Sequence, residues 1–233
     1  MVTVSQGGGD YENLPVGRYK AQCYKIIDTG TRSESFQGQP EKKRHKLFLY
    51  WEITQQLQVE NGNEVWTDVQ MSDGRPFSVS KPYTASLNEN ATLFKDLKSW
   101  RGRSFTDEEL KGFELGKVLR VTCELELIGR GDETDSRTKI EGIYKPDGGP
   151  KVVETINEAA EFDIELYCQE FKGNSSAESK KMCDIWEDLP EWMKEEIENS
   201  FEVRAAKGSS PASKDNGMSD FTKDEDPDED IPF

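Results

Sequence analysis

Residues 46–54 read KLFLYWEIT and form the clearest alternating stretch in the chain. In an extended strand, successive side chains point to opposite sides. One side would carry four apolar residues, which are Leu47, Leu49, Trp51 and Ile53. The other would carry Phe48 and Tyr50 between Lys46 and Glu52. Exposed aromatic rings are unfavourable in water unless something covers them. The stretch therefore predicts a strand with one face in a core and a second face that is covered or binds a ligand.

Four further stretches show the period of two that is typical of strands, and they are residues 17–28, 75–83, 117–128 and 137–145. Residues 88–100, which follow the third strand, have apolar residues at steps of three and four and indicate an amphipathic helix. The dipeptide Asn61-Gly62 favours a tight hairpin turn, and Thr106 with Glu109 forms a capping-box pattern.

Three strands, a helix and two strands follow one another in a five-stranded Greek-key barrel of the oligonucleotide-binding (OB) type. The sequence thus predicts a mainly β fold of this type with helical insertions. Other small barrels and sandwiches are compatible with the same order and stay open. We expect a flexible arm over residues 1–14, an OB-type domain over 15–150, an acidic helical extension packed on the barrel over 151–204, and a disordered linker with an acidic tip over 205–233.

The net charge of −16 is unevenly distributed. Residues 1–130 contain 18 Lys or Arg and 18 Asp or Glu, whereas residues 152–204 contain 5 and 15, and residues 205–233 contain 3 and 8. The first part is thus neutral and locally basic, with its most basic run, KKRHK, at residues 42–46. The overall acidity therefore does not exclude a nucleic-acid ligand for the first part of the chain.

Several classes of protein lack support in the sequence. The four cysteines have no Cys-x-x-Cys spacing and His45 is the single histidine, so neither a zinc site nor a catalytic scheme with two histidines is expected. Isolated thiols indicate a reducing, cytoplasmic compartment. The first residues do not resemble a signal peptide, and no apolar run approaches the ~20 residues that cross a bilayer. We expect no cofactor, no metal, no membrane association and no enzymatic activity.

Aromatic residues alternate with Lys and Arg on the predicted strands. Single-stranded nucleic acid is held by bases stacked on aromatic rings and by cations along the phosphates. The candidate stacking residues are Tyr24, Phe48, Tyr50 and Tyr83. The candidate phosphate contacts are Arg18, Lys20, Lys43, Arg44, Lys46, Lys81, Arg101 and Arg103. Each ring could instead belong to the core, and Arg101 or Arg103 could simply cap a helix end.

Five short stretches strengthen this interpretation, and they read GRYKA at 17–21, IIDTGT at 26–31, YWE at 50–52, FSVSKPYT at 77–84 and LKSWRGR at 97–103. Together they resemble a family of bacteriophage single-stranded DNA-binding proteins over roughly residues 15–145. The resemblance implies a protein that coats and protects single-stranded DNA without sequence specificity, in DNA replication, recombination and repair in the host cytoplasm.

The last ten residues read DEDPDEDIPF, six acids around a proline and then three mostly apolar residues. This tip resembles the C-terminal tip of bacterial single-stranded DNA-binding proteins, which implies that it recruits replication and repair proteins. The residues that would contact them are Asp228, Glu229, Asp230, Ile231, Pro232 and Phe233. An acidic tail kept for solubility explains the acids but not the apolar end.

Two other functions stay open. An acidic adaptor or DNA mimic that inhibits a host DNA-processing enzyme fits the charge after residue 151, and a metal-dependent nuclease fits the abundance of carboxylates. The expected partners are single-stranded DNA and the proteins recruited by the tip. A homo-oligomer is also left open, because the body of the chain differs from the tetrameric bacterial proteins.

Overall fold

The computed structural model describes residues 12–35, 40–129 and 137–208. Seven strands form one sheet, and they are β1 (Gly17–Glu34), β2 (Lys42–Glu60), β3 (Asn63–Asp68), β4 (Ser78–Thr84), β5 (Thr122–Gly129), β6 (Thr138–Tyr144) and β7 (Ala160–Phe162). The α-helices are α1 (Thr92–Arg101), α2 (Asp107–Lys111), α3 (Ile164–Phe171), α4 (Ala177–Glu187), α5 (Glu191–Glu198) and α6 (Phe201–Ala206), and Leu115–Val118 is a 3₁₀ helix.

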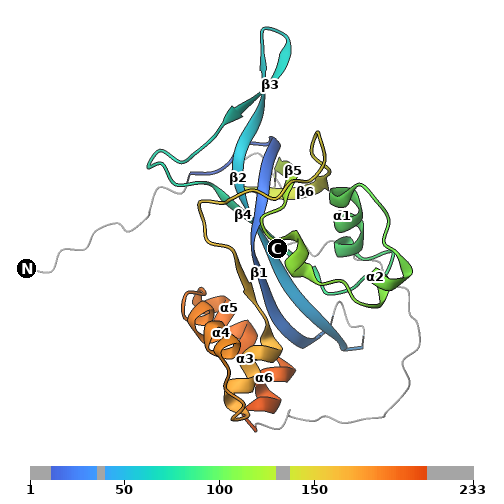
Figure 1. Ribbon diagram of the computed structural model, residues 1–233, viewed down its shortest axis with the longest axis vertical. Coiled ribbons are helices and arrows are strands. Elements are labelled where there is room, and N and C mark those ends of the chain that lie inside the picture. Colours follow the sequence, from blue (N-terminus) through green and yellow to red (C-terminus); the bar gives the residue numbers. More distant parts are fainter. Residues whose placement is uncertain (1–11, 36–39, 130–136, 209–233) are drawn as a thin grey trace, which may run out of the picture.

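The sheet is built around the two longest strands. β1 pairs with β2 on one side and with β5 on the other, β2 also pairs with β3 and β4, and β5 pairs with β6, all antiparallel. The short strand β7 adds to β1 in parallel. α1 and α2 lie on one side of these strands, whereas α3–α6 gather beside the end of β1 opposite to the β3 hairpin (Figure 1).

The mainly β prediction is confirmed, but the predicted five-stranded closed barrel is not. Among the described residues the sheet has seven strands and does not close. β2 is 19 residues long, and its last part forms a projecting hairpin with β3 (Figure 1). Asn61 and Gly62 turn this hairpin with φ of 52° and 81°, as the Asn-Gly pair predicts. The seventh strand, β7, belongs to the C-terminal extension.

The predicted core face of β2 is confirmed. Leu47, Leu49, Trp51 and Ile53 are all buried. They pack with Tyr19, Cys23 and Leu125 of neighbouring strands and with Leu97 and Trp100 of α1. Gly102 ends α1 in the left-handed conformation at φ 66°, and the capping box of Thr106 and Glu109 begins α2. The apolar residues at steps of three and four thus pack α1 on this first core.

A second core lies on the other side of β1. Its buried members are Ile27, Phe162, Ile164, Tyr167, Cys168, Met182, Leu189, Met193, Ile197 and Val203. Ile27 is the one member from the main sheet, and the rest come from β7 and the helices that follow it. The predicted acidic extension is thus a folded helical layer, which we call the C-terminal helical unit (residues 160–208). It begins on β1 and covers part of the sheet.

The boundaries predicted from composition differ at both ends. Residues 12–14, assigned to a flexible arm, contact the body, since Leu14 is buried in the first core and Glu12 accepts hydrogen bonds from Ser72. α6 runs to Ala206, two residues into the predicted linker. Residues 1–11 and the acidic tip 224–233, including all six predicted partner-binding residues, lie outside the described part of the chain.

Gly30 should be required for the helical unit to pack on β1. Its φ is 77°, and a Cβ there would lie 2.7 Å from Ser200 Cβ and would also meet Ile164. Gly62 has a similar φ of 81°, but no atom lies within 4 Å of its Cβ position. We expect Gly30→Ala to lower the free energy of unfolding by about 1–3 kcal/mol more than Gly62→Ala. Alanine strains the backbone at both positions, but its Cβ collides with other atoms only at position 30. Equal losses in chemical denaturation would contradict this packing.

Candidate nucleic-acid interface

The predicted stacking rings of β2 lie beneath the C-terminal helical unit. Phe48 and Tyr50 point away from the first core and pack against the second core. The ring of Trp192 on α5 meets Phe48 edge-on at 5.5 Å between centroids. The hydroxyl of Tyr50 donates to the sulfur of Met193 over 4.0 Å, and burial raises the pKa of Tyr50 to about 12. The cover that the aromatic pair requires is therefore supplied by the chain itself.

Tyr24 joins these rings on the same face. It meets Tyr50 edge-on at 6.3 Å between centroids, and Lys25 Nζ lies 5.8 Å from the Tyr24 ring and 5.9 Å from the Tyr50 ring. Tyr24 is itself buried, and its hydroxyl is hydrogen-bonded to Ser78 Oγ at 2.8 Å. Three of the four predicted stacking residues thus form one row of rings, which is covered in this structure.

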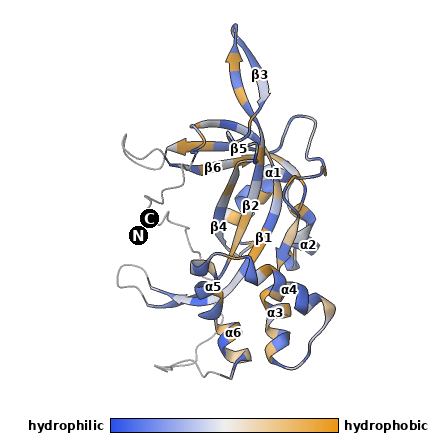
Figure 2. Ribbon diagram, turned by 90° about the vertical axis from the view of Figure 1, so that its left-hand side faces the viewer, coloured by the Kyte–Doolittle hydropathy of each residue, from blue (hydrophilic) through white to orange (hydrophobic). Residues whose placement is uncertain are grey.

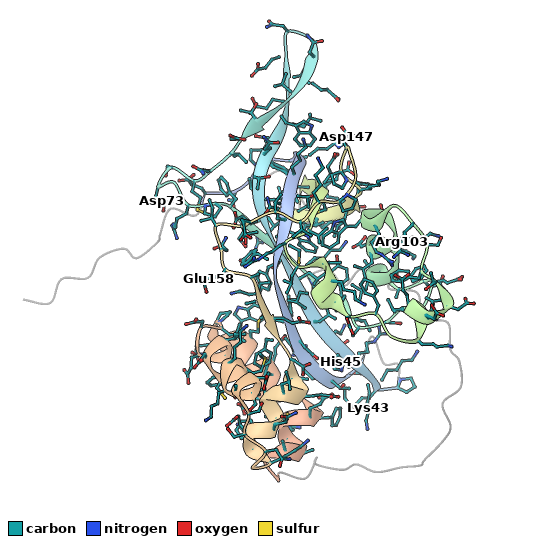
Figure 3. All side chains as sticks on the ribbon, in the orientation of Figure 1. Lys43, His45, Asp73, Arg103, Asp147 and Glu158 are labelled. Carbon is teal, nitrogen blue, oxygen red and sulfur yellow. The ribbon has the colours of Figure 1, made fainter. Side chains whose placement is uncertain are left out.

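The basic run at the start of β2 also has partners within the protein. Lys46 Nζ lies 3.1 Å from Glu34 on the neighbouring strand, and Arg44 Nε lies 3.8 Å from the same carboxylate. Lys43 Nζ lies over the ring of Phe201 on α6 at 4.7 Å. These three cations lie at the edge of the covered face, and Figure 3 shows Lys43 and His45 at the same end of the sheet.

Lys81 and Tyr83 share one partner on α1. Lys81 Nζ lies 2.9 Å from Asp96 Oδ2, and the hydroxyl of Tyr83 donates to the same oxygen over 2.8 Å. Tyr83 is buried in the first core, and burial raises its pKa well above the usual value. Its ring is therefore not available for stacking, and the pair joins β4 to the helix.

The remaining four predicted contacts lie in two other places. Arg18 is paired with the buried Glu124 at 2.6 Å, and Lys20 Nζ lies 4.5 Å from the ring of Trp66 on the projecting hairpin.

Arg101 and Arg103 both pair with Glu109 of α2. The hydrogen bond from Arg103 is the largest cause that lowers the pKa of Glu109 to about 2, and the charge of Arg101 adds to it. The structure thus does not bring the predicted residues together as one site.

A cluster of free cations that the sequence does not single out lies near the end of α1. A surface hollow of about 450 Å³ is lined by Lys95, Lys98, Ser99, Gly102, Arg103 and Ser104. The aliphatic part of Lys145 on the segment after β6 lies against the Cα of Gly102, where there is no side chain. We call this surface the α1 hollow.

Three lysines at the α1 hollow are free, whereas Arg103 is paired with Glu109. Lys95, Lys98 and Lys145 are exposed, and within the described ranges their side chains form no ion pair or hydrogen bond. No acidic side chain is among the residues that line the hollow. Because the charge of a free lysine is not neutralised by the protein, it can attract an anion such as a phosphate group.

An apolar hollow adjoins the basic one. It has a volume of about 220 Å³, and its lining includes Trp100, Phe113, Val118, Val121 and Pro150 together with Arg101, Arg103, Glu109 and Lys117. Arg103 lines both hollows. The guanidinium of Arg101 lies over the rings of Phe105 and Phe113 at 4.5 and 4.8 Å. Free cations and a partly exposed ring therefore lie side by side at this end of the molecule.

The sequence holds only part of the signal for this surface. Lys95 and Lys98 are three residues apart on the predicted helix 88–100, so they lie on one face of it. Lys145 reaches Gly102 at the end of this helix because β6 packs beside α1. That approach depends on the tertiary fold, and no local pattern reveals it.

Other kinds of site find no support in the described ranges. No three His, Cys, Asp or Glu side chains gather there as metal ligands would. None of the helices described is both long and apolar enough to span a lipid bilayer.

Comparison of the chain with protein-family models, curated proteins and solved structures gave no match. The residues themselves therefore carry the functional argument.

His45 joins the helical unit to the sheet by charge. Its Nε2 lies 2.7 Å from Asp28 Oδ1, and its Nδ1 lies 3.1 Å from Thr31 Oγ1 and 3.7 Å from Glu202 Oε1 on α6. Glu202 also accepts hydrogen bonds from the backbone and hydroxyl of Thr31. The hydrogen bond with Asp28 raises the pKa of His45 against the effect of burial, and the charges of Asp28, Glu202 and Glu165 add to the increase.

This contact should make stability depend on pH. Because the pKa of His45 is raised in the folded state, protonation stabilises the fold fully below the unfolded pKa of about 6.5. The stabilisation is lost as pH rises through the folded-state pKa. We expect the difference in Tm between the wild type and His45→Gln to be larger at pH 5.5 than at pH 8.5. A difference that is the same at both values would show that the ring contributes by packing alone.

Proposed function

We propose that the protein binds single-stranded DNA without sequence specificity and that the α1 hollow holds its phosphates. The observation that carries the proposal is that Lys95 and Lys98 line one hollow that no acid lines, while Lys145 lies against Gly102 of the same lining. The side chains of all three lysines are without an ion pair in the described ranges. Elsewhere the predicted cations are largely engaged by carboxylates or rings of the protein.

The two adjoining hollows suit a single strand chemically. Phosphates need cations and hydroxyl donors, which Lys95, Lys98, Ser99 and Ser104 supply. Bases need apolar or aromatic surface, which Phe113 and its neighbours supply in the second hollow. Stacking on rings and charge on phosphates discriminate little between bases, so binding by these contacts would show little sequence preference.

The strand pairing supports an OB-type fold as part of this proposal. β1 pairs with β2 and β5, β2 pairs with β4, and β5 pairs with β6, while α1 lies between β4 and β5 in the chain. This pairing is compatible with an OB-type Greek-key barrel, with β4 and β6 approaching each other without pairing. Many OB-type barrels bind oligonucleotides.

The resemblance of residues 15–145 to bacteriophage proteins extends the proposal to DNA replication, recombination and repair. The acidic segment 224–233 would recruit proteins of those processes, a role that rests on its sequence. Its many carboxylates repel the phosphates of DNA, so recruitment and DNA binding use different parts of the chain.

A second function, a DNA mimic that inhibits a DNA-processing enzyme, is favoured by one observation. The outward-facing acids of α4 and α5, among them Glu178, Asp184, Glu187 and Glu195, are exposed, and both helices are largely hydrophilic in Figure 2. A mimic places carboxylates where an enzyme expects phosphates. It would not itself bind DNA, which separates the two proposals.

Neutralising the hollow should weaken DNA binding. We expect the triple variant Lys95→Gln, Lys98→Gln, Lys145→Gln to lower affinity for an oligo-dT strand. The slope of log K against log salt concentration should fall by about 2, since each phosphate contact on a single strand contributes about 0.7. Fluorescence anisotropy with a labelled oligonucleotide measures both quantities.

A matched control makes the same change of charge elsewhere. Lys172, Lys180 and Lys181 are exposed on the C-terminal helical unit, which lies away from α1 (Figure 1). The variant with these three lysines changed to glutamine should keep the wild-type affinity and slope. If both triple variants lose affinity equally, only overall charge matters and the hollow is not the site. A wild type that binds no oligonucleotide at low salt would overturn the proposed function itself.

A further inference from the structure

The face of the sheet beneath α5 and α6 has the chemistry of a nucleic-acid site even though protein covers it. We propose that this covered face, formed by Phe48, Tyr50 and Arg32 with Tyr24 and Lys25 beside them, is a second site for single-stranded nucleic acid. In the absence of DNA, α5 and α6 cover Phe48, Tyr50 and the cations at its edge. The proposal rests on the proposed function, because it names a further part of the same protein that would hold the same ligand.

The rings of the covered face form a continuous row. Phe48 lies 6.5 Å from Tyr50, and Tyr50 lies 6.3 Å from Tyr24, between ring centroids. Lys25 Nζ lies within 6 Å of both tyrosine rings. A row of rings with a cation beside it is what a single strand requires, because the bases stack on the rings while the cation pairs with a phosphate.

The helices contact this face with a ring and carboxylates, where single-stranded DNA would place bases and phosphates. Trp192 places an indole ring against Phe48, as a base would. Glu196 Oε2 lies 3.0 Å from Arg32 Nη1, and Glu202 lies 3.7 Å from His45, as phosphates would. The helical unit thus meets the ring row with a ring and the cations with carboxylates. A strand of DNA could replace each of these contacts with one of the same kind.

The polar contacts between α5 and the sheet are incomplete, whereas Glu202 of α6 accepts two hydrogen bonds from Thr31. Among the described residues, the Tyr50 hydroxyl has one hydrogen-bond partner, a sulfur atom at 4.0 Å, and sulfur is a weak acceptor. Glu196 Oε2 is buried and forms an ion pair with Arg32, but it accepts no hydrogen bond. Trp192 keeps 49% of its surface exposed. Groups that are imperfectly satisfied in one arrangement lose little when another ligand takes over.

The helices α3–α6 keep most of their shared core if they move away from this face together. Nine of the ten buried members of the second core belong to residues 162–203, and only Ile27 comes from β1. Of the described residues after Phe162, none pairs with a strand of the sheet. Displacement of α5 and α6 together with α3 and α4 therefore breaks side-chain contacts and the hydrogen bonds from Thr31 to Glu202, and it leaves the strand pairing of the sheet unchanged.

Weakening the cover should expose the site. We expect Glu196→Gln with Glu202→Gln to bind an oligo-dT strand about tenfold more tightly than the matched control, since apparent affinity rises with the fraction of open molecules. The control, Glu191→Gln with Glu195→Gln, changes the same charge on the exposed side of α5. Circular dichroism and Tm establish that both variants are folded.

The gain must depend on the rings of the covered face. In the Glu196→Gln, Glu202→Gln background, Phe48→Leu with Tyr50→Leu keeps apolar side chains against α5 but removes the surfaces for stacking, and we expect it to abolish the gain. Adding the three glutamines of the α1 hollow should leave the gain in place. Equal affinity of the cover variant and its control, or a gain that survives the two leucines, overturns the second site.

A measurement on the unaltered chain gives an independent answer. Saturating oligo-dT should speed amide hydrogen exchange in α5 and α6 and slow it in β2 if the strand displaces the helices. Unchanged exchange in α5 and α6 with bound DNA would mean that the cover is permanent and the proposal wrong. Failure of the α1 hollow variant to affect wild-type binding would instead count against the proposed function alone, so the two failures are distinguishable.

Discussion

The structure depends on the two apolar faces of β2. A strand in a sheet can bury one face in a core, and β2 buries Leu47, Leu49, Trp51 and Ile53 in the first core. The opposite face carries Phe48 and Tyr50, whose rings require a cover of their own. The chain meets this constraint by returning after β6, adding β7 to β1 and laying α5 over the rings. The acidic composition of the helical unit follows from its place, since its outward surface faces water.

Much of the fold was predictable from local patterns. The inward face of β2, the turn at Asn61-Gly62, the helix closed by Gly102 and the capping box at Thr106 each depend on residues close in sequence. The prediction was less accurate where distant segments decide. The strand predicted over 117–128 begins only at Thr122. Arg120, at φ 60°, donates its amide hydrogen to the carbonyl of Cys23, and this turn interrupts the extended backbone before Thr122.

The candidate site was less predictable than the fold. Alternation correctly places Phe48 and Tyr50 on the outer face, but it cannot reveal that Trp192 and Met193 cover them. Composition identifies cations without their partners, so Arg18 and Lys81 appear free in the sequence and are paired in the structure. Lys145 lies against the end of α1 because β6 packs beside that helix, and no short motif encodes this contact.

β1 belongs to both cores, and this limits where the chain can be divided. Cys23 faces the first core, and Ile27, four residues later, faces the helical unit. Unfolding of one core therefore disturbs the strand that supports the other, so the described body should unfold in a single cooperative transition. A fragment that stops after β6 would leave the ring row open to water and prone to self-association. The shift in composition after residue 151 is thus a change of surface chemistry, and it does not mark the edge of an independent folding unit.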